Sequence, residues 1–231
     1  LAVYVFGGVD ISPLDCVRDL GVTLDLHLTM KQHVEVVARS CFYQLRQLRS
    51  VRRSLTFEAL RTVVQAFVIS RVDYCNAVLY GVAAQVIRQL QAVLHAAARL
   101  ISGVRLHDHI TPTLRDTLHW LPAAQRVEYK VAVMAFDCVR GTCPAYFRDV
   151  CRPVSTVAGR AGLRSVNRND LVVPRCRGKR YGPRSLRISA PSVWNTLPVD
   201  LRSINISREQ FCCGLKTCLF NRAYYTPEAL L

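Results

Sequence analysis

Apolar side chains recur at every third or fourth position over much of residues 29–150, and this period constrains the fold more than any other feature of the sequence. Such spacing places the apolar residues on one face of an α-helix. It predicts a first helix after the N-cap residue Thr29, a second from Thr56 to Tyr74, and a third over 84–101 that ends before Gly103. The apolar face of the third helix consists of Val86, Leu90, Val93, Leu94, Ala97 and Ile101.

Further helices are predicted towards the C-terminus. A short one follows Pro112, and a longer one follows Pro122 and ends at Gly141, because proline suits the first turn of a helix. A last helix over about 207–222 presents Phe211, Leu215 and Leu219 on one face. Between them, residues 152–184 read as an exposed basic loop, and residues 185–190 alternate in the manner of a strand.

The N-terminal residues have the composition of short strands. The run 2–6 is apolar, and the runs 9–11 and 17–24 look like further short strands with Pro13 in the turn between them, which predicts a hairpin or a small meander. An isolated hairpin is only marginally stable in water, so it needs a packing partner. The fold class predicted for the whole chain is therefore α+β and predominantly α.

The net charge is +15, and most of the surplus lies in the C-terminal part. Residues 1–139 contain 15 basic and 11 acidic residues, whereas residues 140–231 contain 16 basic and 5 acidic ones. Phosphate backbones and acidic membrane surfaces are the natural partners of such a field. Arginine supplies most of the positive charge, and its planar guanidinium group can bind a phosphate through two hydrogen bonds, which favours nucleic acid as the partner. The alternative is a preference for arginine codons in the coding sequence. Because no apolar run approaches the ~20 residues of a membrane span, no membrane association is expected.

Two clusters of basic residues are the candidate nucleic-acid contacts. The first lies at the end of the first predicted helix and contains Arg46, Arg49, Arg52 and Arg53. The second is denser and contains Arg175, Arg177, Lys179, Arg180, Tyr181, Arg184 and Arg187. Charges that follow phosphates, beside a ring that stacks on a base, are typical of single-strand binding. The alternatives are cations that satisfy a helix dipole and a solvated loop whose tyrosine packs on the protein.

The motifs indicate no catalytic or metal centre. The chain lacks a Gly-x-Ser-x-Gly elbow, a Gly-x-x-x-x-Gly-Lys phosphate loop and an Asp-Asp dipeptide. A zinc site would have to draw on residues without Cys-x-x-Cys spacing, namely Cys138, Cys143, Cys151, His107, His109 and His119. Buried reduced thiols are favoured instead, and these are typical of the cytoplasm and the nucleus.

A series of short blocks extends through nearly the whole chain. The main ones are Leu20-Gly21-Val22-Thr23-Leu24-Asp25, Arg52-Arg53-Ser54-Leu55-Thr56, Ser70-Arg71-Val72-Asp73-Tyr74-Cys75-Asn76, Ala96-Ala97-Ala98-Arg99-Leu100, His109-Ile110-Thr111-Pro112, His119-Trp120-Leu121-Pro122, Gly182-Pro183-Arg184-Ser185, Trp194-Asn195-Thr196-Leu197-Pro198 and Phe220 to Tyr224. In their shared order, these blocks resemble the reverse transcriptases of non-LTR (LINE-type) retrotransposons, in the part that follows the catalytic palm.

The resemblance implies a place in a larger protein. In that family an endonuclease, fingers and a palm with a Tyr/Phe-x-Asp-Asp magnesium site come first. This chain begins with Leu1, after that motif, so it is expected to be a non-catalytic fragment without a cofactor, magnesium being implied only for the missing palm. Residues 1–28 are expected to form the end of the palm sheet, 29–150 a helical thumb-like bundle, and 151–231 a basic C-terminal segment with a loop, a short strand and a final helix.

The expected function follows from this place. The fragment would hold template–primer or target nucleic acid (RNA, DNA or an RNA–DNA hybrid) by its phosphate backbone, in the nucleus or the cytoplasm. Its other partners would be the missing palm and endonuclease of the parent chain. Two alternatives remain open: a host-adopted remnant that binds a protein partner, and a translated relic without a selected function.

Overall fold

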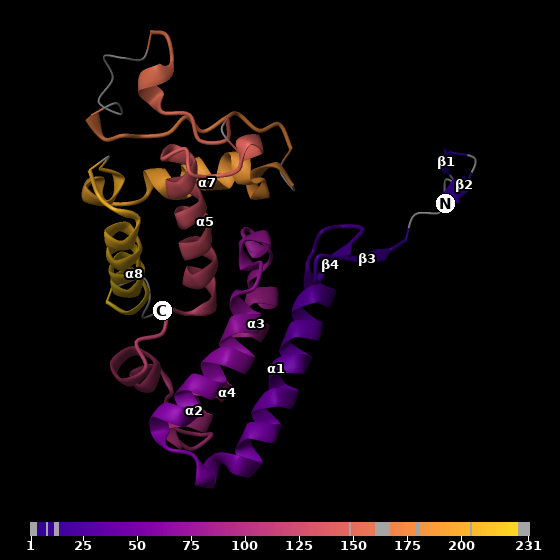
Figure 1. The fold of residues 1–231 in the computed structure, drawn as a ribbon, viewed down its shortest axis with the longest axis vertical. Helices are drawn as coiled ribbons and strands as arrows, with labels where there is room; N and C mark the ends of the chain where they lie inside the picture. The colour runs from indigo at the N-terminus through magenta and orange to yellow at the C-terminus, as the bar shows by residue number, and fades with distance from the viewer. Residues whose placement is uncertain are drawn as a thin grey trace. The chain divides into compact units, whose positions relative to one another are not determined.

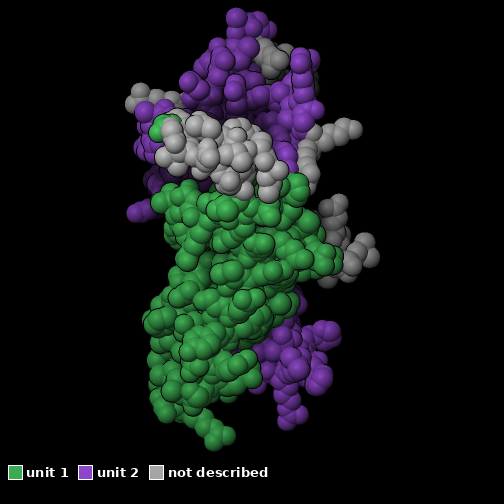
Figure 2. Space-filling view, turned by 90° about the vertical axis from the view of Figure 1, so that its right-hand side faces the viewer, with its two compact units in different colours: residues 1–75, 82–97 green, residues 76–81, 98–231 purple. Residues whose placement is uncertain are grey.

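The structure is a computed structural model that describes residues 4–7, 9–11, 14–147, 149–159, 167–178, 181–203 and 205–225. It confirms an α+β fold that is predominantly α (Figure 1). The chain forms two compact units, coloured separately in Figure 2. The first comprises residues 1–75 and 82–97, and the second comprises residues 76–81 and 98–231. The compact units therefore divide within the predicted bundle, and the division at residues 28 and 150 stays a prediction.

Two antiparallel hairpins begin the first unit. Strand β1 (Tyr4–Phe6) pairs with β2 (Val9–Ile11), and β3 (Cys16–Asp19) pairs with β4 (Val22–Asp25). The second hairpin turns through Leu20 and Gly21, which both have left-handed backbone angles (φ 45° and 83°). Two such residues form the short turn whose twist matches that of the strands. The hairpin prediction is confirmed, as two separate two-stranded sheets.

Helix α1 (Lys31–Val51) follows the second hairpin and buries one face, formed by His33, Val34, Ala38, Cys41 and Leu45. The prediction that Thr29 is its N-cap is wrong. Met30 holds that position in a left-handed conformation. The carboxylate of Asp25, at the end of β4, accepts hydrogen bonds from the backbone N–H groups of His27, Thr29 and Met30 at 2.8–3.1 Å. The chain entering the helix is thus organised by a strand residue.

The second predicted helix is confirmed as a nearly continuous run. Thr56 is the N-cap of α2 (Phe57–Val64), a π-helical turn follows (Gln65–Ile69), and α3 (Ser70–Asp73) ends the run. This run lies beside α1 (Figure 1). Two bonds connect them: the thiol of Cys41 donates to the carbonyl of Val68, and Arg71 donates to the hydroxyl of Ser40 at 2.9 Å. The third predicted helix is α4 (Ala84–Ser102), and all six residues of its predicted apolar face are buried.

The second unit is built on α5 (Ala123–Val139), which packs against α7 (Leu186–Asn195) and α8 (Arg208–Tyr224). The rings of Phe136 and Phe211 stack at 4.4 Å, and Trp194 lies 5.9 Å from Phe211. Ser207 and Gln210 form a capping box at the start of α8. Shorter turns complete the fold: 3-10 helices at Arg52–Ser54, Asn76–Leu79, Ala145–Phe147, Val154–Thr156, Gly182–Arg184 and Val199–Arg202, and a π-helical turn at Thr113–Thr117.

The strand predicted at residues 185–190 is wrong, because this segment begins helix α7. Leu186, Ile188 and Ala190 alternate over a short window, but the buried residues Ala190, Val193, Trp194 and Leu197 follow a helical period. The bulky Trp194 completes that face and packs in the core, so tertiary packing decides between the two patterns. None of the helices in the described ranges combines the length and the apolar character needed to cross a membrane.

Candidate nucleic-acid interface

The first basic cluster lies at the end of α1 and in the 3-10 turn after it. Arg46, Arg49 and Arg53 are exposed, and Arg52 is half-buried. On a helix with 3.6 residues per turn, Arg46 lies roughly 100° around the axis from the buried Leu45, so the arginines flank the buried face of α1. The exposed arginines face solvent within the first unit.

Two aromatic side chains and a further arginine extend this face. Arg39 is exposed, and the exposed fractions of Phe42 and Tyr43 are 42% and 58%. Steps of three and four residues from position 39 through 42, 46, 49 and 53 define one stripe along the helix. We call Arg39, Phe42, Tyr43, Arg46, Arg49 and Arg53 the α1 stripe. Prediction from sequence missed its aromatic members, although the same spacing rule would have found them.

Within the described ranges, the arginines of the α1 stripe form no ion pairs with acidic side chains. Among the described residues, the arginine–carboxylate pairs involve other side chains: Arg61–Glu58, Arg115–Asp116, Arg168–Asp170, Arg202–Asp170, Arg208–Asp137 and Arg222–Glu128. Arg39, Arg46, Arg49 and Arg53 take part in none of these pairs. Their guanidinium groups are therefore available to an external anion.

The second basic cluster lies in the second unit. Arg175, Arg177 and Arg187 are exposed and have no carboxylate partner among the described residues, and 42% of Tyr181 is exposed. Arg184 is different: it is half-buried, and its Nε donates to the carbonyl of Tyr80 at 3.3 Å. Part of its role is therefore to hold the fold. Lys179 and Arg180 lie outside the described residues.

The chain leading into this cluster is anchored by α7. The side-chain amide of Asn195 accepts from the N–H of Leu171 at 2.8 Å and donates to its carbonyl at 2.9 Å. The indole N–H of Trp194 donates to the carbonyl of Asn169 at 2.9 Å. Asp170 forms an ion pair with the buried Arg202. Arg175 and Arg177 thus follow a segment held at fixed points, although most of the segment is irregular.

Two of the sequence blocks meet inside the first unit. The hydroxyl of Tyr74 donates to the carbonyl of Leu20 at 2.8 Å, and its ring is so close to Gly21 that a Cβ there would lie 3.3 Å from Cε1. The left-handed glycine therefore allows both the turn and the contact.

Two further blocks meet in the second unit. The hydroxyl of Tyr224 donates to the carbonyl of Trp120 at 2.8 Å, and the rings of His119 and Phe220 lie 6.2 Å apart. Burial raises the pKa of Tyr224 to about 12, against the opposing effect of Arg126 and Arg115, so the hydroxyl stays protonated and able to donate. These blocks have structural roles.

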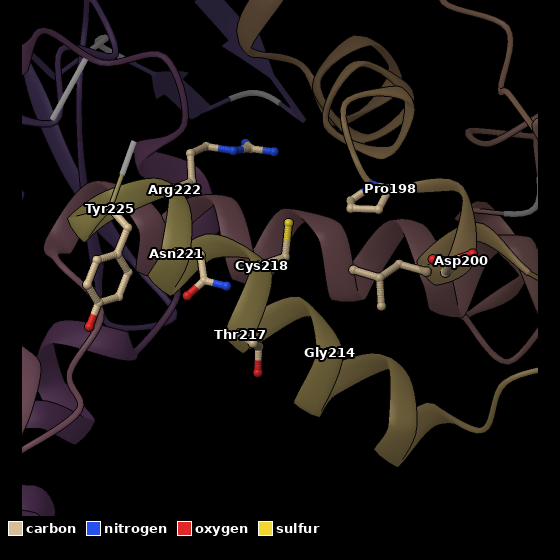
Figure 3. Close-up of a pocket in the computed structure, with 9 residues that line it drawn as sticks. Pro198, Asp200, Gly214, Thr217, Cys218, Asn221, Arg222 and Tyr225 are labelled. Carbon is tan, nitrogen blue, oxygen red and sulfur yellow. The ribbon is translucent and has the colours of Figure 1, made fainter. Parts of the chain in front are cut away.

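An open groove of about 1060 Å³ lies along α8 in the second unit (Figure 3). Its lining combines an apolar part with the polar side chains of Asp200, Thr217, Asn221 and Arg222. Arg222 is engaged, because its Nη1 lies 2.7 Å from Glu128 and its Nη2 donates to the carbonyl of Thr196.

Metal coordination has no support in the described part of the chain, where no three His, Cys, Asp or Glu side chains are arranged to hold an ion. The cysteines considered for zinc do come together: Cys138 and Cys151 are buried and Cys143 packs beside them, all as free thiols. The histidines considered with them, His107, His109 and His119, are exposed.

Comparison with protein-family models, with curated proteins and with solved structures finds no match to this chain.

Proposed function

We propose that this chain is a non-catalytic part of a retrotransposon RNA-directed DNA polymerase and that it holds RNA, DNA or an RNA–DNA hybrid by the phosphate backbone. The observation that carries the binding proposal is the α1 stripe, whose arginines are exposed and form none of the ion pairs found among the described residues. The proposed ancestry rests on the order of the sequence blocks. An Asp-Asp palm motif upstream in the same reading frame would support it, and an unrelated upstream sequence would contradict it.

The mechanism is electrostatic. Each guanidinium that contacts a phosphate releases counterions, so the affinity falls as the salt concentration rises. The rings of Phe42 and Tyr43 lie among these charges and are placed to stack on bases. Arg175, Arg177 and Arg187 supply a second set of exposed cations in the other unit. Such contacts give binding that depends on salt and only weakly on sequence.

The decisive experiment removes charge from the α1 stripe and measures the salt dependence of RNA binding. The test variant is Arg46→Gln/Arg49→Gln/Arg53→Gln. The control is Arg61→Gln/Arg115→Gln/Arg208→Gln, which removes the same charge from three arginines that pair with acids, of which Arg61 and Arg208 are exposed and Arg115 is half-buried. Fluorescence anisotropy with a labelled single-stranded RNA gives the dissociation constant at several salt concentrations, and far-UV circular dichroism checks the fold of both variants.

A plot of log K against log salt concentration has a negative slope, and each lost phosphate contact on a single strand makes it shallower by roughly 0.7. With three arginines replaced, we expect the slope of the test variant to be shallower than that of the wild type by about 2. Between about 50 and 200 mM salt, its affinity then falls roughly 20-fold less than that of the wild type. The control should keep most of the wild-type slope. Equal slopes in wild type and test variant, or a larger change in the control, would contradict the proposal.

A protein partner is the second candidate, and the hairpin of β3 and β4 favours it. Large apolar side chains are exposed there, with exposed fractions of 82% for Leu20, 68% for Leu14 and 63% for Leu26. Exposed apolar patches often mark interaction sites. Sedimentation velocity separates the candidates: self-association that persists at high salt and is lost in Leu14→Gln/Leu26→Gln supports the protein-binding role.

A further inference from the structure

Three cysteines belong to the core around the end of α5: Cys138 in the helix, Cys143 in the turn after it, and Cys151 further along the chain. Cys138 and Cys151 are buried in the core of the second unit, and Cys143 packs against the same core while remaining half-exposed. Besides burial, the neighbouring thiols of Cys151 and Cys143 raise the pKa of Cys138. We call these residues the thiol cluster. Neither the proposed nucleic-acid function nor a metal site uses it.

Backbone hydrogen bonds return the chain at Cys143 to the last turn of α5. The N–H groups of Thr142 and Cys143 both donate to the carbonyl of Asp137, at 3.0 and 3.3 Å, and the hydroxyl of Thr142 donates to the same oxygen at 3.2 Å. Gly141 makes this return possible because its backbone is left-handed (φ 69°). The chain at Cys143 is thereby folded back onto the last turn of α5, which contains Cys138.

The three thiols differ in their access to an external oxidant. Burial raises the pKa of Cys138 and Cys151, the latter to about 11, so both stay protonated at neutral pH. Cys143 is the half-exposed member. An oxidant from solvent therefore meets Cys143 first, and the neighbouring Cys138 is more deeply buried.

We propose that the thiol cluster is a site of oxidation by peroxide, in which Cys143 reacts first and Cys138 closes a disulfide with it. Hydrogen peroxide oxidises the Cys143 thiol to a sulfenic acid and releases one water. The sulfur of Cys138 then attacks the sulfenic sulfur, the S–O bond breaks as the S–S bond forms, and the hydroxyl leaves as a second water with the thiol proton. Two thiols thus lose two electrons and two protons, and one peroxide becomes two waters.

The sequence allows a direct test on the full chain. Trypsin cleaves after Lys130, Arg140 and Arg148, so each member of the cluster falls in a separate peptide. After treatment with hydrogen peroxide and blocking of the remaining thiols, mass spectrometry of a non-reduced digest should find peptide 131–140 linked to peptide 141–148. The link should disappear on reduction.

Two variants make the test specific. Cys143→Ser should lose the link and leave Cys138 as an unmodified thiol. Cys213→Ser removes an exposed cysteine outside the cluster and should leave the link unchanged. The proposal is overturned if Cys143 proceeds to sulfinic or sulfonic acid without a link to Cys138. A link from Cys138 to Cys151 that forms equally well in Cys143→Ser also overturns it, as do cross-links confined to Cys176 and Cys213 between molecules.

Discussion

Asn195 is the residue whose removal tests most sharply how the basic segment is anchored. Both ends of its side-chain amide bond to the backbone of Leu171, which is 3% exposed. In Asn195→Ala, the N–H and the carbonyl of Leu171 lose these partners while they remain buried. Leaving a buried polar group without a partner costs about 1–3 kcal/mol, so two such groups, with some water entry, should cost about 2–4 kcal/mol.

Urea denaturation followed by tryptophan fluorescence measures this cost. The signal reports on the second compact unit of the fold, because both tryptophans, Trp120 and Trp194, belong to it. Asn195→Asp should be at least as destabilising, since one carboxylate oxygen would then face the carbonyl of Leu171. Asn221→Ala is the control: this asparagine is exposed on α8, and its loss should change the free energy of unfolding by less than about 0.5 kcal/mol. A loss below about 1 kcal/mol in Asn195→Ala would refute the reasoning.

Two further predictions concern the first unit. Burial lowers the pKa of His33 below 6.5, and its Nδ1 accepts a hydrogen bond from the N–H of Thr23. Because the unfolded chain then binds a proton more readily than the folded one, the contribution of His33 to stability should be complete above pH 6.5. It should be lost as the pH falls through the pKa of the folded state. Hydrogen exchange of the α1 amides should show this loss, and His33→Asn should abolish it; an unchanged pH profile in the variant would contradict the role of His33. Gly21→Ala should lower stability by about 1 kcal/mol or more, because the left-handed backbone is strained and Tyr74 must shift. Gly141→Ala is the comparison, because Gly141 is also left-handed (φ 69°) but has open space around an added Cβ, so it measures the backbone strain alone. If thermal melts show the same loss of stability in both variants, the contact with Tyr74 contributes nothing.

The helices were predictable because their cause is local. The face from Val86 to Ile101 repeats at the helical period, and each of its six residues is buried. Thr56 and Ser207 precede their helices as polar N-caps, a signal contained within four residues of sequence. The turn at Leu20 and Gly21, in contrast, lies inside the run 17–24, which the sequence pattern assigned to a strand without a turn.

The basic interface was only partly predictable. Sequence spacing located the arginines of α1, but whether a guanidinium is free depends on acids far away in the chain. Arg208 pairs with Asp137 and Arg222 with Glu128 across α5 and α8, whereas Arg46 and Arg49 meet no acid among the described residues. Arg184 counted as a surface cation in the sequence, yet it bonds to Tyr80, more than a hundred residues away.

By itself, the sequence determined where most helices begin and end and that the charge is concentrated in arginine. Only the tertiary structure decided that residues 186–195 are a helix, that Asp25 rather than Thr29 organises the start of α1, and that three distant or turn-separated thiols meet beside α5. The physical reason is the range of the forces involved. Periodicity and capping act over a few residues, whereas core packing, hydrogen-bond partners and ion pairs depend on which segments the folded chain brings together.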